Sequence, residues 1–137
     1  MTSNPPYHTL QRSKECGLAS VCFALDLNYK EISDIFVKRY GGRWDDVKVR
    51  QPHLAKAFIR ELGMKGIWFD ISMPMRGVPD LKGRGVMTIV FSRNQQRHAV
   101  AFRDGVIHDS DKLYPMEFHE WRKRTARFTI DGYERVK

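Results

Sequence analysis

The hydrophobic period changes once along the chain, near residue 64, and this change limits the fold more than any other feature. Before it, apolar residues recur at helical spacing over residues 16–27, 29–40 and 52–63. After it, short apolar runs predict strands at 65–71, 85–92, 97–102, 106–110 and 126–130. A short helix from Pro115 to about Arg124 interrupts them. Helices followed by neighbouring strands predict an α+β fold, in which N-terminal helices pack on a C-terminal antiparallel sheet.

Cap and turn residues set the expected limits of the helices. Asn28 followed by Glu31 is a capping-box pattern at the start of the second helix. Gly63 is a typical stop for the helix that begins at Pro52. The stretch 41–46, Gly-Gly-Arg-Trp-Asp-Asp, is expected to be a loop between them.

Length and composition narrow the class of protein. A chain of 137 residues suits one domain, expected over residues 11–137 and preceded by an extended arm at 1–10, where two prolines block regular structure. The chain has no apolar run long enough to cross a bilayer. Its first residues lack the apolar stretch of a signal peptide, so a cytoplasmic location is expected. No cofactor is expected.

Positive charge permits a second kind of partner. Lysine and arginine number 24 against 16 aspartates and glutamates, which allows contact with nucleic acid or with an acidic protein surface. The basic residues are scattered apart from a cluster at 121–127, which a solvated helix end would explain. A non-catalytic basic module therefore stays an alternative, with Trp121 and Phe128 as its aromatic residues.

The two cysteines occupy different positions on the expected first helix. One apolar stripe is formed by Leu18, Val21, Cys22 and Leu25. Cys22 is therefore expected to be a buried core residue. Cys16 points away from the stripe at the first turn, where free backbone amides lower the pKa of a thiol. Their spacing directs the two side chains to different faces, so free thiols are expected, with Cys16 as a candidate nucleophile.

The dipeptide Asp104-Gly105 is a strong signal for a two-residue hairpin turn. If these residues form the turn, alternation places one set of side chains on a common face: His98, Val100, Phe102, Ile107, Asp109 and Asp111. An imidazole thus shares a sheet face with two carboxylates, and geometry alone leaves open which of Asp109 and Asp111 orients it. A thiol, an imidazole and an orienting acid are the parts that covalent acyl transfer needs.

Two further predictions concern neighbouring groups. Gln11 lies five residues before Cys16, so its side-chain amide and the Cys16 backbone N–H are candidates to hold a developing oxyanion. His98, His108, Asp109 and Asp111 are close in sequence but match no recognised ligand spacing, and His108 should face away from His98. No metal site is therefore expected.

The order of these features resembles the C39-type peptidase domain, a compact branch of the papain-like cysteine peptidases. The stretch LQRSKECGLASVCFAL is similar to the start of that domain. Four later stretches are similar to further parts of that domain: HLAKAFIRELGMKG to its middle helix, RHAVAF to its histidine strand, GVIHDS to its aspartate strand and MEFHEW to its closing helix. The resemblance covers roughly residues 7 to 124. It implies a papain-like fold with Cys16 as nucleophile, His98 as general base and acid, Asp109 as the group that orients His98, and Gln11 in the oxyanion hole.

The expected function is therefore that of a cysteine peptidase that hydrolyses a peptide or isopeptide bond in a protein or peptide substrate. Two alternatives remain open at this stage. The same thiol chemistry would serve an acyltransferase, and the basic surface would serve a module that binds nucleic acid or an acidic protein.

Overall fold

The protein is described here by a computed structural model that covers residues 15–63, 68–71 and 79–136. The elements follow in the order α1 (Cys16–Ala24), α2 (Tyr29–Tyr40), α3 (Trp44–Arg50), α4 (Pro52–Gly63), β1 (Trp68–Ile71), β2 (Arg84–Phe91), β3 (Arg97–Arg103), β4 (Val106–His108), β5 (Met116–Glu117), α5 (Phe118–Lys123) and β6 (Phe128–Val136). Helices precede an antiparallel sheet, so the predicted α+β class is confirmed. The expected arm at 1–10 and Gln11 lie outside the described residues.

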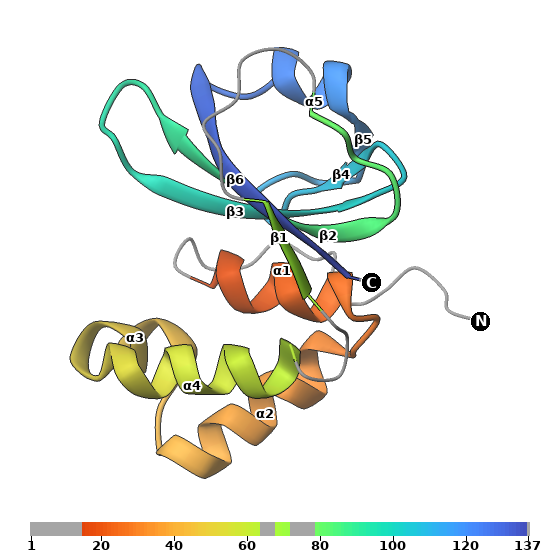
Figure 1. Cartoon of the computed structure of the whole chain (residues 1–137). Helices are drawn as coiled ribbons and strands as arrows, with labels where there is room; N and C mark the ends of the chain where they lie inside the picture. The colour runs from red at the N-terminus through yellow and green to blue at the C-terminus, as the bar shows by residue number, and fades with distance from the viewer. Residues whose placement is uncertain (1–14, 64–67, 72–78, 137) are drawn as a thin grey trace.

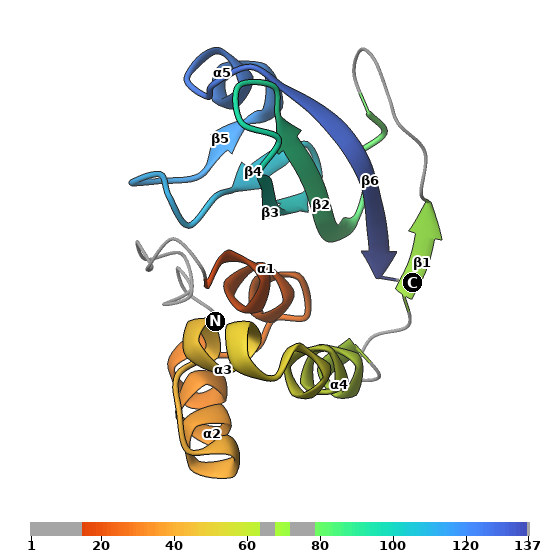
Figure 2. The ribbon, with the colours of Figure 1, turned by 90° about the vertical axis from the view of Figure 1, so that its left-hand side faces the viewer.

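Helix α1 is the middle layer of the molecule. In Figures 1 and 2 it lies between the sheet on one side and α2, α3 and α4 on the other. Every residue from Cys16 to Ala24 except Gly17 is buried. The residues of the predicted apolar stripe are buried in the core as expected, but the rest of the helix apart from Gly17 is buried too, because it contacts protein on both sides. Among the described residues, no helix is long and apolar enough to cross a membrane.

The sheet has six strands in the order β1-β6-β2-β3-β4-β5, and all neighbours are antiparallel. It separates two hydrophobic clusters. One cluster joins α1 to the other N-terminal helices and includes Leu18, Phe36 and Phe58. The second lies on the opposite face, where the strands curve over α5 (Figure 1), and includes Trp121 and Phe102.

The N-terminal helices differ from the prediction at two places. Helix α1 ends at Ala24 rather than at residue 27, because Asp26 adopts a left-handed conformation (φ 60°) and the Leu27 N–H donates to the Cys22 carbonyl at 2.7 Å. The expected loop at 41–46 is wrong, because α3 begins within it at Trp44. Two aspartates occupy the first turn of α3, where negative charge suits the helix dipole.

The capping prediction for α2 is confirmed, and the limits of α4 match the prediction. The Asn28 side chain accepts a hydrogen bond from the Glu31 N–H at 3.0 Å, and α2 starts at the next residue after Asn28. Gly41, with φ 73°, ends α2 in the left-handed conformation that glycine adopts without steric cost. Helix α4 runs from Pro52 to Gly63, as predicted.

The C-terminal strands differ from the prediction in their limits. Only residues 68–71 of the predicted 65–71 strand are described. The predicted strand at 126–130 continues to Val136, across a register shift opposite Thr88 and Ile89 that leaves Asp131 as an extra residue. The predicted helix from Pro115 is shorter and begins at Phe118, after β5, where the Glu117 side chain caps it.

The predicted hairpin between β3 and β4 is confirmed. Asp104 and Gly105 both have positive φ angles, 48° and 87°, as a two-residue turn of this kind requires. Phe102 pairs with Ile107, as the turn register predicts. Strand β4 nevertheless ends at His108 rather than at residue 110, so the residues that follow leave the ladder and turn back toward the start of β3.

Candidate active site

Cys16 is the first residue of α1 and lies against the start of β3. Its side chain is 8% exposed. The His98 side chain and the Ala99 backbone N–H lie close enough to the sulfur to lower the pKa of the thiol through hydrogen bonding. The start of the opening helix and the start of a late strand, more than eighty residues apart, are thus in contact at this thiol.

His98 is held on its other side by a carboxylate. Its Nε2 lies 2.8 Å from Oδ1 of Asp109, and both side chains are almost fully buried. Because Nε2 is occupied in this way, Nδ1 is the ring nitrogen left to meet the Cys16 thiol. The Phe91 ring stacks on the imidazole at a centroid distance of 5.8 Å, which restricts rotation of the ring.

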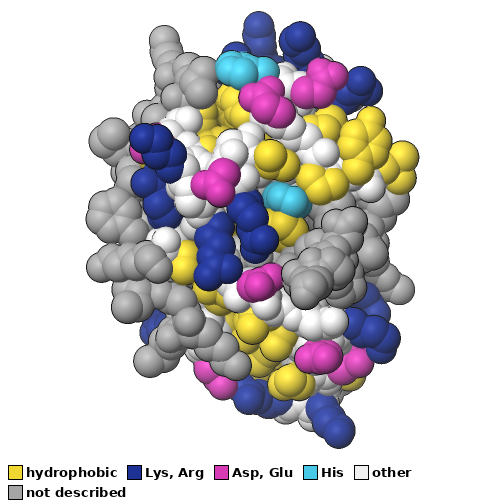
Figure 3. Space-filling model, turned by 90° about the vertical axis from the view of Figure 1, so that its right-hand side faces the viewer, with side chains coloured by type: hydrophobic (Ala, Val, Ile, Leu, Met, Phe, Trp, Pro, Cys, Tyr) yellow, Lys and Arg dark blue, Asp and Glu magenta, His cyan; other side chains and the backbone are white. Residues whose placement is uncertain are grey.

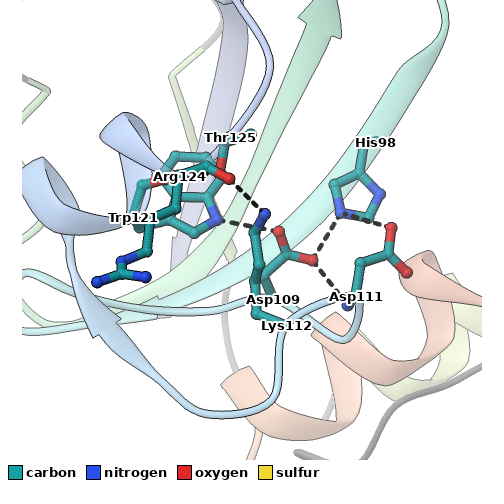
Figure 4. A network of polar contacts seen from close by, with 7 residues as sticks. All are labelled: His98, Asp109, Asp111, Lys112, Trp121, Arg124 and Thr125. Atoms are coloured by element: carbon teal, nitrogen blue, oxygen red, sulfur yellow. Dashed lines mark hydrogen bonds and ion pairs between the residues drawn. The ribbon is translucent and has the colours of Figure 1, made fainter.

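Asp109 follows β4 directly and accepts hydrogen bonds on both oxygens (Figure 4). Oδ1 accepts from the Asp111 backbone N–H at 2.9 Å, and Oδ2 accepts from the indole Nε1 of Trp121 at 2.9 Å. Trp121 is fully buried in α5. The carboxylate is therefore fixed from three directions, which leaves it one orientation toward His98.

One contact braces the loop that carries Asp109 against the end of α5 (Figure 4), and a second lies within the end of that helix. The Lys112 ammonium donates to the Arg124 carbonyl at 2.7 Å. The Thr125 hydroxyl donates to the Trp121 carbonyl at 2.6 Å. The indole and the carboxylate that it contacts therefore belong to one packed unit.

The three side chains shift one another's pKa values. Burial alone raises the pKa of the Cys16 thiol, but the hydrogen bond and charge of His98, the Ala99 N–H and the charge of Lys48 outweigh it and hold that pKa below its usual value. Burial works against a charged imidazole too, yet the contacts with Asp109 and Cys16 raise the pKa of His98 to about 10. Both shifts act in the same direction, toward a thiolate beside an imidazolium.

Asp109 shows the complementary shift. Burial raises the pKa of its carboxyl, but the hydrogen bond and charge of His98 and the donors from Trp121 and Asp111 outweigh it, so the pKa lies below its usual value. Asp111 differs, because burial and repulsion by Asp109 raise the pKa of its carboxyl despite the nearby imidazole. Of the two acids, Asp109 is thus the one held as a hydrogen-bonded carboxylate.

Asp111 lies farther from the imidazole. Its Oδ2 is 3.6 Å from His98 Nε2, and its side chain is 45% exposed. Ligand atoms of His98, Asp109 and Asp111 lie within 4.8 Å of one another, which is the spacing of a possible metal site. A metal ion there would have to break the hydrogen bond between the imidazole and Asp109. The geometry suits proton transfer through His98 better than metal coordination.

The two carboxylates are expected to differ in their effect on His98. Asp109→Asn should lower the pKa of His98 by about 1–3 pH units, since it removes the charge in direct contact. Asp111→Asn should lower it by clearly less, because that carboxylate is more distant and better solvated. The measurement is an NMR titration of the His98 ring carbons. The raised pKa of His98 also makes stability depend on pH. The contribution of the imidazolium to the free energy of folding is complete below about pH 6.5 and is lost as the pH rises through about 10. Equal shifts in the two variants would contradict the assignment.

Glu15 immediately precedes the thiol and is a buried acid that the sequence analysis did not select. Its side chain is 1% exposed. One oxygen accepts a hydrogen bond from the Tyr29 hydroxyl, and the other accepts from the Arg43 guanidinium at 2.5 Å. Burial and the Glu15 carboxylate together raise the pKa of Tyr29. The residue before Cys16 is therefore anchored to the start of α2 and to the residue that precedes α3.

Cys22 has the environment that the sequence predicted. It is fully buried in the helical cluster, and burial raises the pKa of its thiol to about 12. Both cysteines are free thiols, as expected. Only Cys16 has an imidazole beside it among the described residues.

The basic surface does not form a stacking platform around Trp121. That ring is fully buried and its N–H donates to Asp109, so it is not free to stack on a nucleobase. On the face shown in Figure 3, Lys and Arg side chains are interspersed with Asp and Glu. Trp121, one of the two aromatic residues named for the nucleic-acid alternative, is therefore a structural part of the thiol–imidazole site.

The structure thus brings together Cys16, His98 and Asp109, while Gln11 lies outside the described residues. Two residues, Trp121 and Glu15, were not predicted from the sequence to be parts of this site. The role of Trp121 follows from a general signal, since a buried indole N–H needs an acceptor. No local pattern marks Glu15, whose partners are contributed by later elements. Comparisons of this chain with models of protein families, with curated proteins and with solved structures find no match.

Proposed function

We propose that this protein is a cysteine peptidase with a papain-like fold of the C39 type, and that it hydrolyses a peptide or isopeptide bond. The observation that carries the proposal is the buried contact chain from the Cys16 thiol through the His98 imidazole to the Asp109 carboxylate. A helix that presents a cysteine at its start, packed on an antiparallel sheet that presents a histidine, supports the fold assignment.

The proposed reaction uses each group once. The Cys16 thiolate attacks the substrate carbonyl carbon, and the oxyanion that develops accepts hydrogen bonds from the Cys16 backbone N–H and the Gln11 amide. The His98 imidazolium then gives its proton to the leaving amine as the C–N bond breaks. In the second half, neutral His98 takes a proton from water, the hydroxide attacks the thioester, and Cys16 leaves as a thiolate. Asp109 holds the ring and stabilises its positive charge.

The first test is cleavage of a peptide library made from a digested proteome, with new termini identified by mass spectrometry. The wild-type protein is expected to generate new termini, and Cys16→Ser is expected to generate none, since a serine hydroxyl beside this imidazole is a far weaker nucleophile. Iodoacetamide should alkylate Cys16 at pH values well below the ordinary thiol pKa of about 8.5. That rate should fall as acid protonates the thiolate.

Cys22→Ala is the matched control, because Cys22 is a free thiol on the same helix without an imidazole partner. It should retain both cleavage and alkylation. Undiminished cleavage by Cys16→Ser would refute the proposal. Substrate masses increased by an added amine, in place of free new carboxyl termini, would instead identify the enzyme as an acyltransferase.

A further inference from the structure

A hollow of about 380 Å³ lies between α1 and the sheet, near the start of the helix that carries Cys16. Gly17, the residue after Cys16, forms part of its wall, and so does Thr88. Thr88 is the register partner of Ala99, whose N–H contacts the Cys16 sulfur. Both residues place the hollow near the nucleophile. Gly17 follows Cys16 in α1, and Thr88 lies one strand spacing from Ala99.

The wall of this first hollow is mixed: Val21, Ile59 and Val86 supply apolar side chains, while Asp131 and Glu134 supply carboxylates. A Cβ atom added to Gly17 would meet nothing within 4 Å, so the space in front of that residue is open. Asp131, the extra residue of the β6 bulge, also lines the hollow, and its carboxylate pairs with Arg97 at 3.4 Å. The apolar part of the wall, formed by α1, α4 and β2, thus suits an apolar side chain of a bound peptide.

A second hollow of about 480 Å³ adjoins the first, since Trp44, Ile59 and Glu134 line both. Figure 2 shows α1, α4 and β6 around this part of the molecule. The rim of the second hollow is basic. Its cations are Lys48 on α3 and Lys56 and Arg60 on α4, opposed by a single carboxylate, that of Glu134.

Lys48 connects this basic rim to the reactive thiol. Its positive charge is among the groups that lower the pKa of Cys16, so the second hollow lies within electrostatic range of the nucleophile. Lys48, Lys56 and Arg60 are all exposed and available to a ligand. We call the two adjoining hollows the groove: its first part includes Gly17, the residue after Cys16, and its second part carries the cations.

We propose that this groove selects peptide substrates that carry an apolar residue near the scissile bond and acidic residues farther along on the same side. The apolar residue occupies the first hollow and the acidic residues pair with the basic rim of the second. This inference rests on the peptidase function proposed above. The charge of the rim determines which peptides are preferred, because three cations around an apolar floor attract carboxylates and repel basic peptides.

The test measures binding without cleavage. Fluorescein-labelled peptides with a central leucine and two glutamates, two glutamines or two lysines on each side are titrated into the Cys16→Ala protein at low ionic strength, with anisotropy as the readout. Exposed ion pairs contribute up to about 1 kcal/mol each, so the glutamate peptide should bind about tenfold more tightly than the lysine peptide. Adding Lys56→Glu and Arg60→Glu should abolish or reverse that order.

A matched control separates the groove from net charge. Lys38→Glu with Lys123→Glu changes the net charge by the same amount on exposed sites that line neither hollow, and it should leave the preference intact. Equal affinity for the three peptides, no binding, or an equal loss in the control would overturn the inference. Charge-dependent binding without any cleavage by the wild type would retain the groove and reject the peptidase function. Cleavage by the wild type without a charge preference in binding would retain the peptidase function and reject the groove.

Discussion

Replacing His98 with alanine is expected to reduce peptide cleavage by about 10⁴-fold or more. Two losses combine in this variant. The thiolate loses the imidazolium that stabilises it inside a buried site, and the leaving amine loses its proton donor. The measurement is kcat/KM on a peptide that the library experiment identifies, with circular dichroism to show that the variant is folded.

A second readout of the same variant needs no substrate. Without the imidazole, the pKa of Cys16 should rise toward that of Cys22, about 12, since both thiols are buried. Each pH unit of that rise lowers the thiolate fraction at neutral pH about tenfold, and the higher intrinsic nucleophilicity of the more basic thiolate recovers about threefold of that loss. Alkylation by iodoacetamide should therefore slow by about threefold for each pH unit by which the pKa of Cys16 rises.

Cys22→Ala again serves as the control and should alkylate at the wild-type rate. The result that would contradict the proposed pair is a His98→Ala protein whose alkylation rate has the wild-type dependence on pH. Slow cleavage with unchanged alkylation would show that His98 acts on the substrate and does not activate the thiol.

Glu15→Ala is expected to destabilise the fold by about 2–4 kcal/mol. Loss of one partner from a buried ion pair typically costs about 3–5 kcal/mol, and the Arg43 side chain, 46% exposed, recovers part of that through water. The Tyr29 hydroxyl also loses its acceptor. For a chain of this length the unfolding midpoint should fall by about 10 °C. Differential scanning calorimetry measures it.

The comparison for Glu15 is another glutamate–arginine contact, between Glu61 and Arg39 at 2.6 Å. Both of those side chains are about half exposed, so Glu61→Ala should leave the midpoint almost unchanged. Glu15→Gln should fall between the two variants, because the amide oxygen still accepts from the Tyr29 hydroxyl. A Glu15→Ala protein as stable as Glu61→Ala would show that the buried cluster contributes nothing to folding.

Local signals in the sequence predicted the elements whose ends carry strong turn or cap chemistry. Asn28 marked the start of α2 correctly, and Asp104-Gly105 fixed the register of β3 and β4. The same kind of signal misled at 41–46, where two glycines suggested a loop and concealed the start of α3. The strand expected at 126–130 also continues past its expected end, because Asp131 is an extra residue in a bulge inside β6.

The thiol–imidazole site was predictable to a different degree. Alternation along the hairpin brought His98 and two acids to one face, but it could not distinguish Asp109 from Asp111. The difference arises because the chain leaves the ladder after His108, so that Asp109 is held by the indole of Trp121. Packing between sequence-distant elements determines such contacts, and neither period nor spacing records it.

The contact between the first helix and the hairpin also has a consequence for synthesis. A ribosome makes Cys16 long before it makes His98, Asp109 and Trp121. Until the last third of the chain has emerged and docked, the sulfur has no proton acceptor beside it and reacts no faster than a cysteine in a disordered peptide. The chemistry proposed here therefore begins only in completed molecules, and a truncated translation product would be inert.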